Sequence, residues 1–80
     1  MKALITGASS GIGRDMAYYL ASLGYDLYLV ARRKEKLEEI KRKVNTKVTI
    51  ISLDLTKEKN VFKLHQELQK KNMDILINNA

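Results

Sequence analysis

The chain has 80 residues, of which 45% are hydrophobic and 30% charged, a composition typical of one folded globular domain at most. Its formal net charge is +6 and it has no cysteine, which excludes a disulfide framework, a thiolate zinc site and redox chemistry by protein thiols. Because no apolar run approaches the ~18 residues of a membrane span, and the first apolar run is too short for a signal peptide, we expect a cytoplasmic protein without a membrane partner.

The first part of the chain predicts a strand, a helix and a second strand. A short apolar run at residues 3–5 is typical of a buried strand. From residue 12 the apolar spacing becomes helical, with small residues at Ala17 and Ala21 for close packing, and Gly24 supplies a stop signal. The stripe that we expect this helix to bury consists of Ile12, Met16, Leu20 and Leu23. Residues 26–31 predict the second strand.

The rest of the chain continues this alternation. A second amphipathic helix is marked by Leu37, Ile40 and Val44. The β-branched run at residues 47–52 predicts a third strand. Thr56 is the expected N-cap of a third helix. The apolar stripe of that helix is Val61, Leu64 and Leu68. Residues 74–77 predict a fourth strand, and the order β-α-β-α-β-α-β predicts an α/β fold with a parallel sheet and helices on its faces.

Much of the positive charge falls in one stretch. Residues 32–43 contain seven basic and three acidic side chains, a net charge of +4. Such a block is compatible with nucleic acid, anionic lipid or a phosphorylated ligand. The simpler interpretation is a solvated helix face, because Glu38–Arg42 and Glu39–Lys43 have the spacing of stabilising ion pairs.

The segment at residues 6–13, Thr-Gly-Ala-Ser-Ser-Gly-Ile-Gly, lies between the first strand and the first helix. A helix N-terminus exposes unpaired N–H groups and the positive end of the helix dipole, so an anion binds there if no side chain obstructs it. Gly7 can turn the chain out of the strand, Gly11 lets a ligand approach the backbone, and Gly13 lets the helix pack closely on the sheet.

Two serines in this loop, Ser9 and Ser10, offer hydroxyl donors to a phosphate. The spacing G-x-x-x-G-x-G differs from the general dinucleotide fingerprint G-x-G-x-x-G, and no Gly-Lys-Ser/Thr follows as a P-loop would require. A structural alternative is a Gly/Ser turn with a tight helix start.

The loop resembles the cofactor loop of the short-chain dehydrogenase/reductase family, T-G-x-x-x-G-x-G. Asp54-Leu55 follows the third strand, where that family places an aspartate near the adenine, and Asn78-Asn79-Ala80 stands where the family carries N-N-A-G. The three motifs occur in order over the whole chain, so it is similar to the N-terminal, cofactor-binding half of that family.

The resemblance implies a Rossmann-type sheet with strand order 3-2-1-4, in which residues 1–80 form one NADP-binding half-domain. The loop residues would hold the pyrophosphate region, the pair after the third strand the adenine, and the last two residues the adenosine ribose. These expected cofactor-binding residues are Gly7, Ser9, Ser10, Gly11, Ile12, Gly13, Asp54, Leu55, Asn79 and Ala80. Thr6 is expected to be structural, with its hydroxyl tied to the turn at residues 78–79. An alternative for Asp54 is a turn residue that bonds its own backbone.

The end of the second strand discriminates between nucleotides, because an acidic residue there favours a ribose 2′-hydroxyl and repels a 2′-phosphate. Here Ala31 is followed by Arg32 and Arg33. A charge-assisted hydrogen bond is worth about 1.5–3 kcal/mol. We therefore expect NADP(H) to be preferred over NAD(H), mainly through Arg32, with Arg33 either stacked on the adenine or solvated. The alternative is that both arginines only begin a basic helix.

The catalytic pair of the family, Y-x-x-x-K, is not found here. None of the four tyrosines is followed by lysine four positions later, and in the family these groups come after the N-N-A-G turn at which this chain stops. We expect the 80 residues to lack the catalytic Tyr, Lys and Ser and to be inactive alone. The single histidine, His65, is expected to be an ordinary helix residue, and no residues have the spacing of metal ligands.

The fourth strand is expected to have a bare outer edge, because residues 75–77 are apolar and a further strand would normally cover them. This predicts self-association, a companion chain, or a continuation as a longer reductase. The leading hypothesis is the NADP(H)-binding part of an oxidoreductase that transfers hydride to or from a carbonyl or alcohol. The alternatives are a non-catalytic nucleotide-binding or regulatory module and a basic domain for RNA or another polyanion; the strands lack an aromatic platform, which disfavours nucleic acid.

Overall fold

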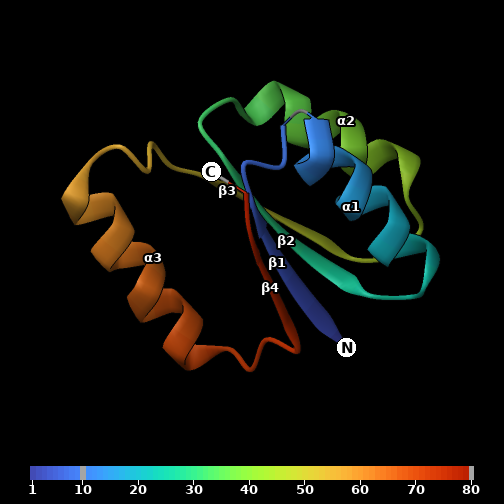
Figure 1. Cartoon of the computed structure of the whole chain (residues 1–80). Helices are drawn as coiled ribbons and strands as arrows, with labels where there is room; N and C mark the ends of the chain where they lie inside the picture. Colours follow the sequence, from blue (N-terminus) through green and yellow to red (C-terminus); the bar gives the residue numbers. More distant parts are fainter. Residues whose placement is uncertain (10, 80) are drawn as a thin grey trace.

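The computed structural model describes residues 1–9 and 11–79, and its seven elements alternate as the sequence predicts (Figure 1). The strands are β1 (Lys2–Thr6), β2 (Asp26–Ala31), β3 (Val48–Ser52) and β4 (Ile75–Asn78). The helices are α1 (Gly11–Ser22), α2 (Lys34–Lys43) and α3 (Glu58–Lys70).

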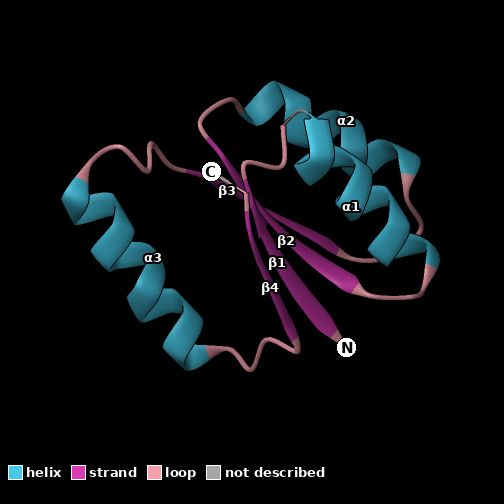
Figure 2. Ribbon diagram, viewed as in Figure 1, coloured by secondary structure: helices cyan, strands magenta, loops and turns pink. Residues whose placement is uncertain are grey.

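The four strands form one parallel sheet in the predicted order β3-β2-β1-β4. Helices α1 and α2 lie on one face of the sheet and α3 on the other (Figure 2). At the end of β1, Thr6 is in register with Val30 of β2 and Asn78 of β4, and Ala31 is in register with Ser52 of β3. The loops that follow all four strands therefore start from the same edge of the sheet.

Both faces of the sheet carry a hydrophobic core, because successive strand residues point to opposite sides. The largest fully buried side chains under α1 and α2 are Ile5, Leu27, Leu29, Leu37 and Ile40. A smaller core lies under α3 and consists of Leu4, Val30 and Leu64. The buried faces predicted for the second helix and for the central strands are thus confirmed.

Helix α1 packs on the sheet mainly through small residues, and half of its predicted apolar stripe is confirmed: Leu20 is buried and Met16 packs against the core. The buried residues of α1 are Gly13, Ala17 and Leu20. Ile12 and Leu23 are 70% and 57% exposed. Small side chains at positions 13 and 17 let the helix backbone approach the strands, and this orientation turns the larger side chains outward. The close packing expected at Ala17 is confirmed.

The charged surface of α2 follows the predicted spacing in part. The Glu39 carboxylate and the Lys43 ammonium lie 3.0 Å apart, as predicted. Glu38 pairs with Lys34 at 3.8 Å. Within residues 1–9 and 11–79 no ion pair joins Glu38 to Arg42, so that prediction is wrong; a residue at i−4 competes for the same carboxylate. All these charges are solvated.

The N-cap of α3 lies one residue later in the sequence than predicted. Lys57 is the N-cap, and Thr56 donates its hydroxyl to the carboxylate of Asp54 at 2.6 Å, so Thr56 is not the cap. Of the predicted stripe, Leu64 is buried, whereas Val61 is 48% exposed. Within the described part of the chain, every helix is too short or too polar to cross a lipid bilayer.

Candidate functional site

Three loops at the carboxyl edge of the sheet surround a cavity of about 390 Å³. Its lining residues are Gly7, Ser9, Val30, Ala31, Arg32, Leu53, Asp54, Leu55 and Thr56. The loops after β1, β2 and β3 all contribute, because these parallel strands end side by side. The volume lies in the range of about 300–1,000 Å³ that is usual for small-molecule pockets. The structure therefore brings five of the predicted binding residues together: Gly7, Ser9, Arg32, Asp54 and Leu55.

The chain passes from β1 into α1 through two glycines with positive φ. Gly7 has φ +62° and Gly11 has φ +59°, a conformation that L side chains rarely adopt. Ser10 lies between them, outside the described residues. Helix α1 starts at Gly11, and its first turn carries no acidic side chain. Its positive end thus stands next to the cavity-lining residues of the loop, with no carboxylate in that turn to repel an anion.

The absent side chain of Gly13 makes room for a contact between two loops. A Cβ atom at this position would lie 2.6 Å from Nδ2 of Asn79 and would also meet the carbonyl oxygen of Gly7. Nδ2 of Asn79 donates to that carbonyl at 3.3 Å. The close approach expected at Gly13 is confirmed. Asn79 lies against the glycine loop, while Ala80 falls outside the described residues.

Thr6 joins the ends of β1 and β4, as predicted. Its hydroxyl donates to Oδ1 of Asn78 at 3.0 Å and accepts from the backbone N–H of Asn79 at 2.9 Å. Thr6 itself is 5% exposed, whereas Asn78 is exposed and Asn79 is partly buried, so both hydrogen bonds are only partly shielded from water. Thr6 therefore fixes the segment from which Asn79 reaches the glycine loop.

Asp54 organises the wall of the cavity that follows β3. Its Oδ1 accepts from the backbone N–H of Thr56 at 3.0 Å and from the Thr56 hydroxyl at 2.6 Å. Its backbone carbonyl accepts from the N–H of Lys57 at 3.2 Å and from Nδ2 of Asn60 at 2.9 Å. The turn given as the alternative role of Asp54 is present, and the same residue lines the cavity, so the turn holds the carboxylate in place there.

The charged form of the Asp54 carboxyl is favoured. The side-chain and backbone hydrogen bonds from Thr56 lower its pKa below the ordinary value, and the charges of Arg32 and Lys57 act in the same direction. Since Arg32 and Asp54 line the same cavity, one wall carries a guanidinium and another a carboxylate. This arrangement can bind a ligand that has a phosphate and a hydrogen-bond donor at separate ends.

The two consecutive arginines lie in different surroundings. Arg32 directly follows β2 and lines the cavity. Arg33 is the exposed N-cap of α2, with φ −100° and ψ 111°, and lies outside the set of described residues that line the cavity. Ile12 is outside that set as well. Of the two arginines, Arg32 is the one that lines the cavity.

Three polar residues of the site were not anticipated: Ser52, Thr56 as a turn residue, and Asn60. The spacing Asp-x-Thr is typical of turns closed by side chains, so Thr56 could have been found. Ser52 could have been found from the strand order, which sets the end of β3 beside the end of β2. The bond from Asn60 depends on the direction of α3, for which the sequence holds no signal.

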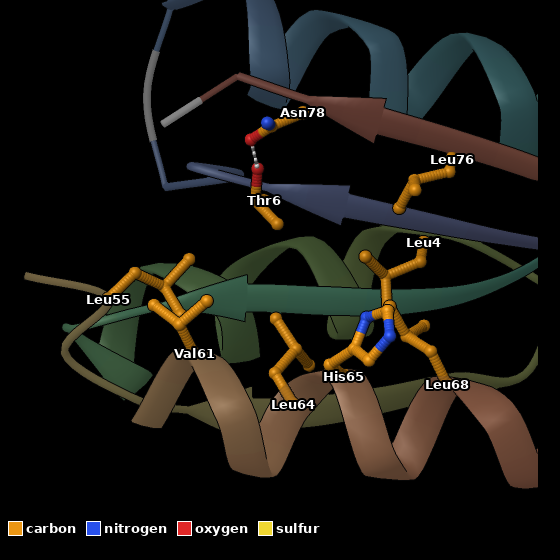
Figure 3. Close-up of a pocket in the computed structure, with 9 residues that line it drawn as sticks. All are labelled: Leu4, Thr6, Leu55, Val61, Leu64, His65, Leu68, Leu76 and Asn78. Atoms are coloured by element: carbon orange, nitrogen blue, oxygen red, sulfur yellow. Dashed lines mark hydrogen bonds between the residues drawn. The ribbon is translucent and has the colours of Figure 1, made fainter. Parts of the chain in front are cut away.

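A second groove of about 320 Å³, lined mostly by apolar residues, lies between α3 and the strands β1 and β4 (Figure 3). It is lined by Leu4, Thr6, Leu55, Val61, Leu64, His65, Leu68, Leu76 and Asn78. His65 is an exposed helix residue, as expected. Among residues 1–9 and 11–79, no cluster of His, Cys, Asp and Glu could hold a metal ion. The lining of the groove is therefore mainly an apolar surface with a few polar residues.

Comparison with known proteins gives one consistent result. The sequence model of the short chain dehydrogenases matches residues 1–80. The very-long-chain 3-oxoacyl-CoA reductase of Candida albicans is 41% identical over 84 aligned residues, which cover 98% of this chain and 24% of that protein. A short-chain dehydrogenase from Sphingobium yanoikuyae in complex with NADPH has a TM-score of 0.90 and 38% identity, covering 99% of this chain and 33% of that one.

Another similar structure is the L-sorbose reductase from Gluconobacter frateurii complexed with NADPH and L-sorbose. It has a TM-score of 0.82 and 34% identity, and the match covers 99% of this chain and 32% of that one. The chain thus spans about a quarter of the curated reductase and about a third of each solved structure.

Proposed function

The chain belongs to the short chain dehydrogenase family, and from that premise we propose that residues 1–80 are the NADP(H)-binding half-domain of an oxidoreductase. The observation that carries this proposal is the cavity at the carboxyl edge of the sheet, which has Gly7, Arg32 and Asp54 on its walls. The residues that we assign to the cofactor are Gly7, Ser9, Ser10, Gly11, Ile12, Gly13, Arg32, Arg33, Asp54, Leu55, Asn79 and Ala80.

The glycine loop and the start of α1 would hold the diphosphate. Positive φ at Gly7 and Gly11 opens the loop, and the first turn of α1 carries no acidic side chain. Backbone N–H groups at a helix N-terminus are donors for phosphate oxygens. Ser9 lines the cavity and adds a hydroxyl. The residues present therefore fit an anionic ligand at this end of the site.

The loop after β3 would hold the adenine. The Asp54 carboxylate can accept from an amino group, and the Leu55 backbone N–H can donate to a ring nitrogen. Hydrogen bonds from Thr56 already fix that carboxylate. Because the wall is ordered beforehand, less conformational entropy is lost on binding.

Arg32 would bind the 2′-phosphate and so favour NADP(H) over NAD(H). It lines the cavity at the end of β2, where the family preference for one nucleotide is set. The position holds a guanidinium and no carboxylate, which suits a phosphate and would not repel it. Two of the similar solved structures are complexes with NADPH, which supports the same choice.

When bound, NADP(H) donates or accepts a hydride, and we propose a carbonyl or alcohol as the other reactant. The chain spans 24% of the Candida albicans reductase, so we assign substrate binding and acid–base chemistry to regions outside residues 1–80. We expect these 80 residues alone to bind the nucleotide without turnover. The cytoplasmic compartment stays a prediction.

We further propose that the free side of β4 is covered by a companion segment or a second copy of the chain. Within the described residues, β4 pairs only with β1. Leu76 in this strand is 58% exposed. An unpaired apolar edge strand readily pairs with another chain.

Separate titrations with NADPH and NADH, followed by nicotinamide fluorescence, test the assignment. The wild-type chain should bind NADPH more tightly. Arg32→Ala should weaken NADPH binding by about tenfold to a hundredfold and leave NADH unchanged. Arg33→Ala removes the same charge one residue further on; because Arg33 is expected to stack on the adenine or to be solvated, any effect of this change should be alike for NADPH and NADH. Equal affinities in the wild type would contradict the choice of nucleotide, and failure to bind either one would contradict the function.

A further inference from the structure

A side-chain hydrogen bond joins the ends of β2 and β3 beside the cavity. Ser52 is the last residue of β3 and is in register with Ala31. Its hydroxyl donates to the backbone carbonyl of Arg32, with 3.1 Å between Oγ and O. The backbone N–H of Leu53 donates to the carbonyl of Ala31, also at 3.1 Å. The serine side chain thus extends the contact between the two strands by one more carbonyl, beyond their last register pair.

This bond acts on the residue that brings positive charge to the cavity. Both arginines are exposed, but Arg32 lines the cavity, whereas the next residue, Arg33, is the N-cap of α2. The backbone therefore changes direction directly after Arg32. An arginine side chain has many rotamers, and the region that its guanidinium samples depends on how firmly its own backbone is held.

Ser52 itself is exposed and does not belong to the described residues that line the cavity. Ser52 can therefore affect a bound nucleotide only indirectly, through its hydrogen bond to the carbonyl of Arg32. We infer that Ser52 is a positioning residue for the choice between NADP(H) and NAD(H): it fixes the end of β2 so that Arg32 meets the 2′-phosphate. This inference rests on the proposed function.

The inference predicts a selective effect. Without the serine hydroxyl, the Arg32 backbone is held less firmly, and the guanidinium meets the 2′-phosphate less often. NADPH binding should weaken by about threefold to tenfold, the value of one hydrogen bond. NADH has no 2′-phosphate, so its affinity should not change. A bond that served only the stability of the sheet would instead affect both nucleotides alike.

Titration of NADPH and NADH against Ser52→Ala, Ser52→Thr and Ser22→Ala in the full chain tests this. Threonine keeps the hydroxyl and is well tolerated in strands, so Ser52→Thr should restore the wild-type preference. Ser22→Ala is the matched control: that exposed serine also donates to a backbone carbonyl, the one of Tyr19, at the far end of α1. It should leave the preference unchanged.

The double variant Arg32→Ala with Ser52→Ala completes a double-mutant cycle, which measures whether the two residues act on NADPH binding together. If Ser52 acts through Arg32, removing the hydroxyl in the Arg32→Ala background should cause no further loss of NADPH affinity. An unchanged preference in Ser52→Ala, or an equal loss for both nucleotides, overturns the inference and leaves the proposed function intact. A wild-type chain that binds neither nucleotide overturns both.

Discussion

The hydroxyl oxygen of Thr6 accepts a hydrogen bond from the backbone N–H of Asn79 at 2.9 Å, although the two residues are 73 positions apart in the sequence. The same hydroxyl donates its proton to Oδ1 of Asn78 at 3.0 Å. One buried side chain therefore satisfies a donor and an acceptor at the far end of the chain. Its loss would remove both of these hydrogen bonds.

Replacing Thr6 by valine should lower the free energy of unfolding by about 1–3 kcal/mol, because it removes two hydrogen bonds worth about 0.5–1.5 kcal/mol each. Valine has the same shape but neither donates nor accepts. Chemical denaturation measures the change. Thr6→Ser keeps the hydroxyl and should retain most of the stability; a valine variant as stable as the wild type would contradict the structural role.

Replacing Gly13 by alanine should both destabilise the fold and weaken nucleotide binding. The new Cβ would collide with Asn79 and with the carbonyl of Gly7, and overpacking of this kind costs about 1–3 kcal/mol. Relief of the collision displaces the loop that we assign to the diphosphate. Thermal unfolding and NADPH titration report the two effects.

The control for Gly13→Ala is Gly24→Ala, at the other end of α1. Gly24 has φ +91° and open space around the position of a Cβ. Alanine there should cost backbone strain of about 1–2 kcal/mol and leave NADPH affinity as in the wild type. If both variants bound NADPH equally well, the contact between Gly13, Gly7 and Asn79 would have no part in binding.

The ionised carboxyl of Asp54 should stabilise the fold at neutral pH, and this stabilisation should be lost at acidic pH. Hydrogen bonds from Thr56 lower the pKa of Asp54 in the folded state, followed by the charges of Arg32 and Lys57. A carboxyl with a lowered folded-state pKa binds protons more weakly when folded, so its contribution is present above the unfolded pKa, about 4. It is lost as the pH falls through the folded pKa.

Titration of the side-chain carboxyl carbon by NMR checks this directly. Thr56→Ala removes the hydroxyl bond and should raise the pKa of Asp54 toward its ordinary value. The backbone N–H of residue 56 remains, so part of the shift should persist. Glu39 serves as an internal reference, because its lowered pKa comes first from the hydrogen bond with Lys43, and both of these residues lie on α2. An unchanged Asp54 titration would show that the Thr56 hydroxyl does not bond this carboxylate in solution.

Replacing Leu76 by lysine should reduce association through the free side of β4. Leu76 is exposed on this edge strand, and a charged side chain there opposes pairing with another copy. Size-exclusion chromatography with light scattering gives the mass of both proteins. Phe62→Lys, a change of an exposed residue on α3, is the comparison and should leave association unchanged. A monomeric wild-type chain would contradict self-association through β4.

The fold could be predicted because local signals and global pattern agree. The spacing of apolar residues predicted the alternation of strands and helices, and the three family motifs implied the strand order. The side of α1 that packs on the sheet could not be predicted, because apolar spacing shows which residues share a side of a helix but not which side contacts the sheet. Gly13 and Ala17 decide this by their small size, and Ile12 is left outside.

Most of the cavity could be predicted as well, because parallel strands deliver Ser9, Arg32 and Asp54 to one edge. The supporting hydrogen bonds could not. The bond from Ser52 to the Arg32 carbonyl depends on the exact register of two strands. The bond from Asn60 to Asp54 depends on where α3 begins, and its N-cap is Lys57 and not the predicted Thr56.

The position of β1 between β2 and β4 has a consequence for synthesis on the ribosome. β2 emerges soon after β1, but the other neighbour, β4, spans Ile75–Asn78 and is translated last among the described strands. Until β4 has been synthesised, the backbone hydrogen-bonding groups on one side of β1 have no partner strand. Such an incomplete chain can pair wrongly with other chains. The sheet can therefore be completed only after the last of the described strands has been synthesised.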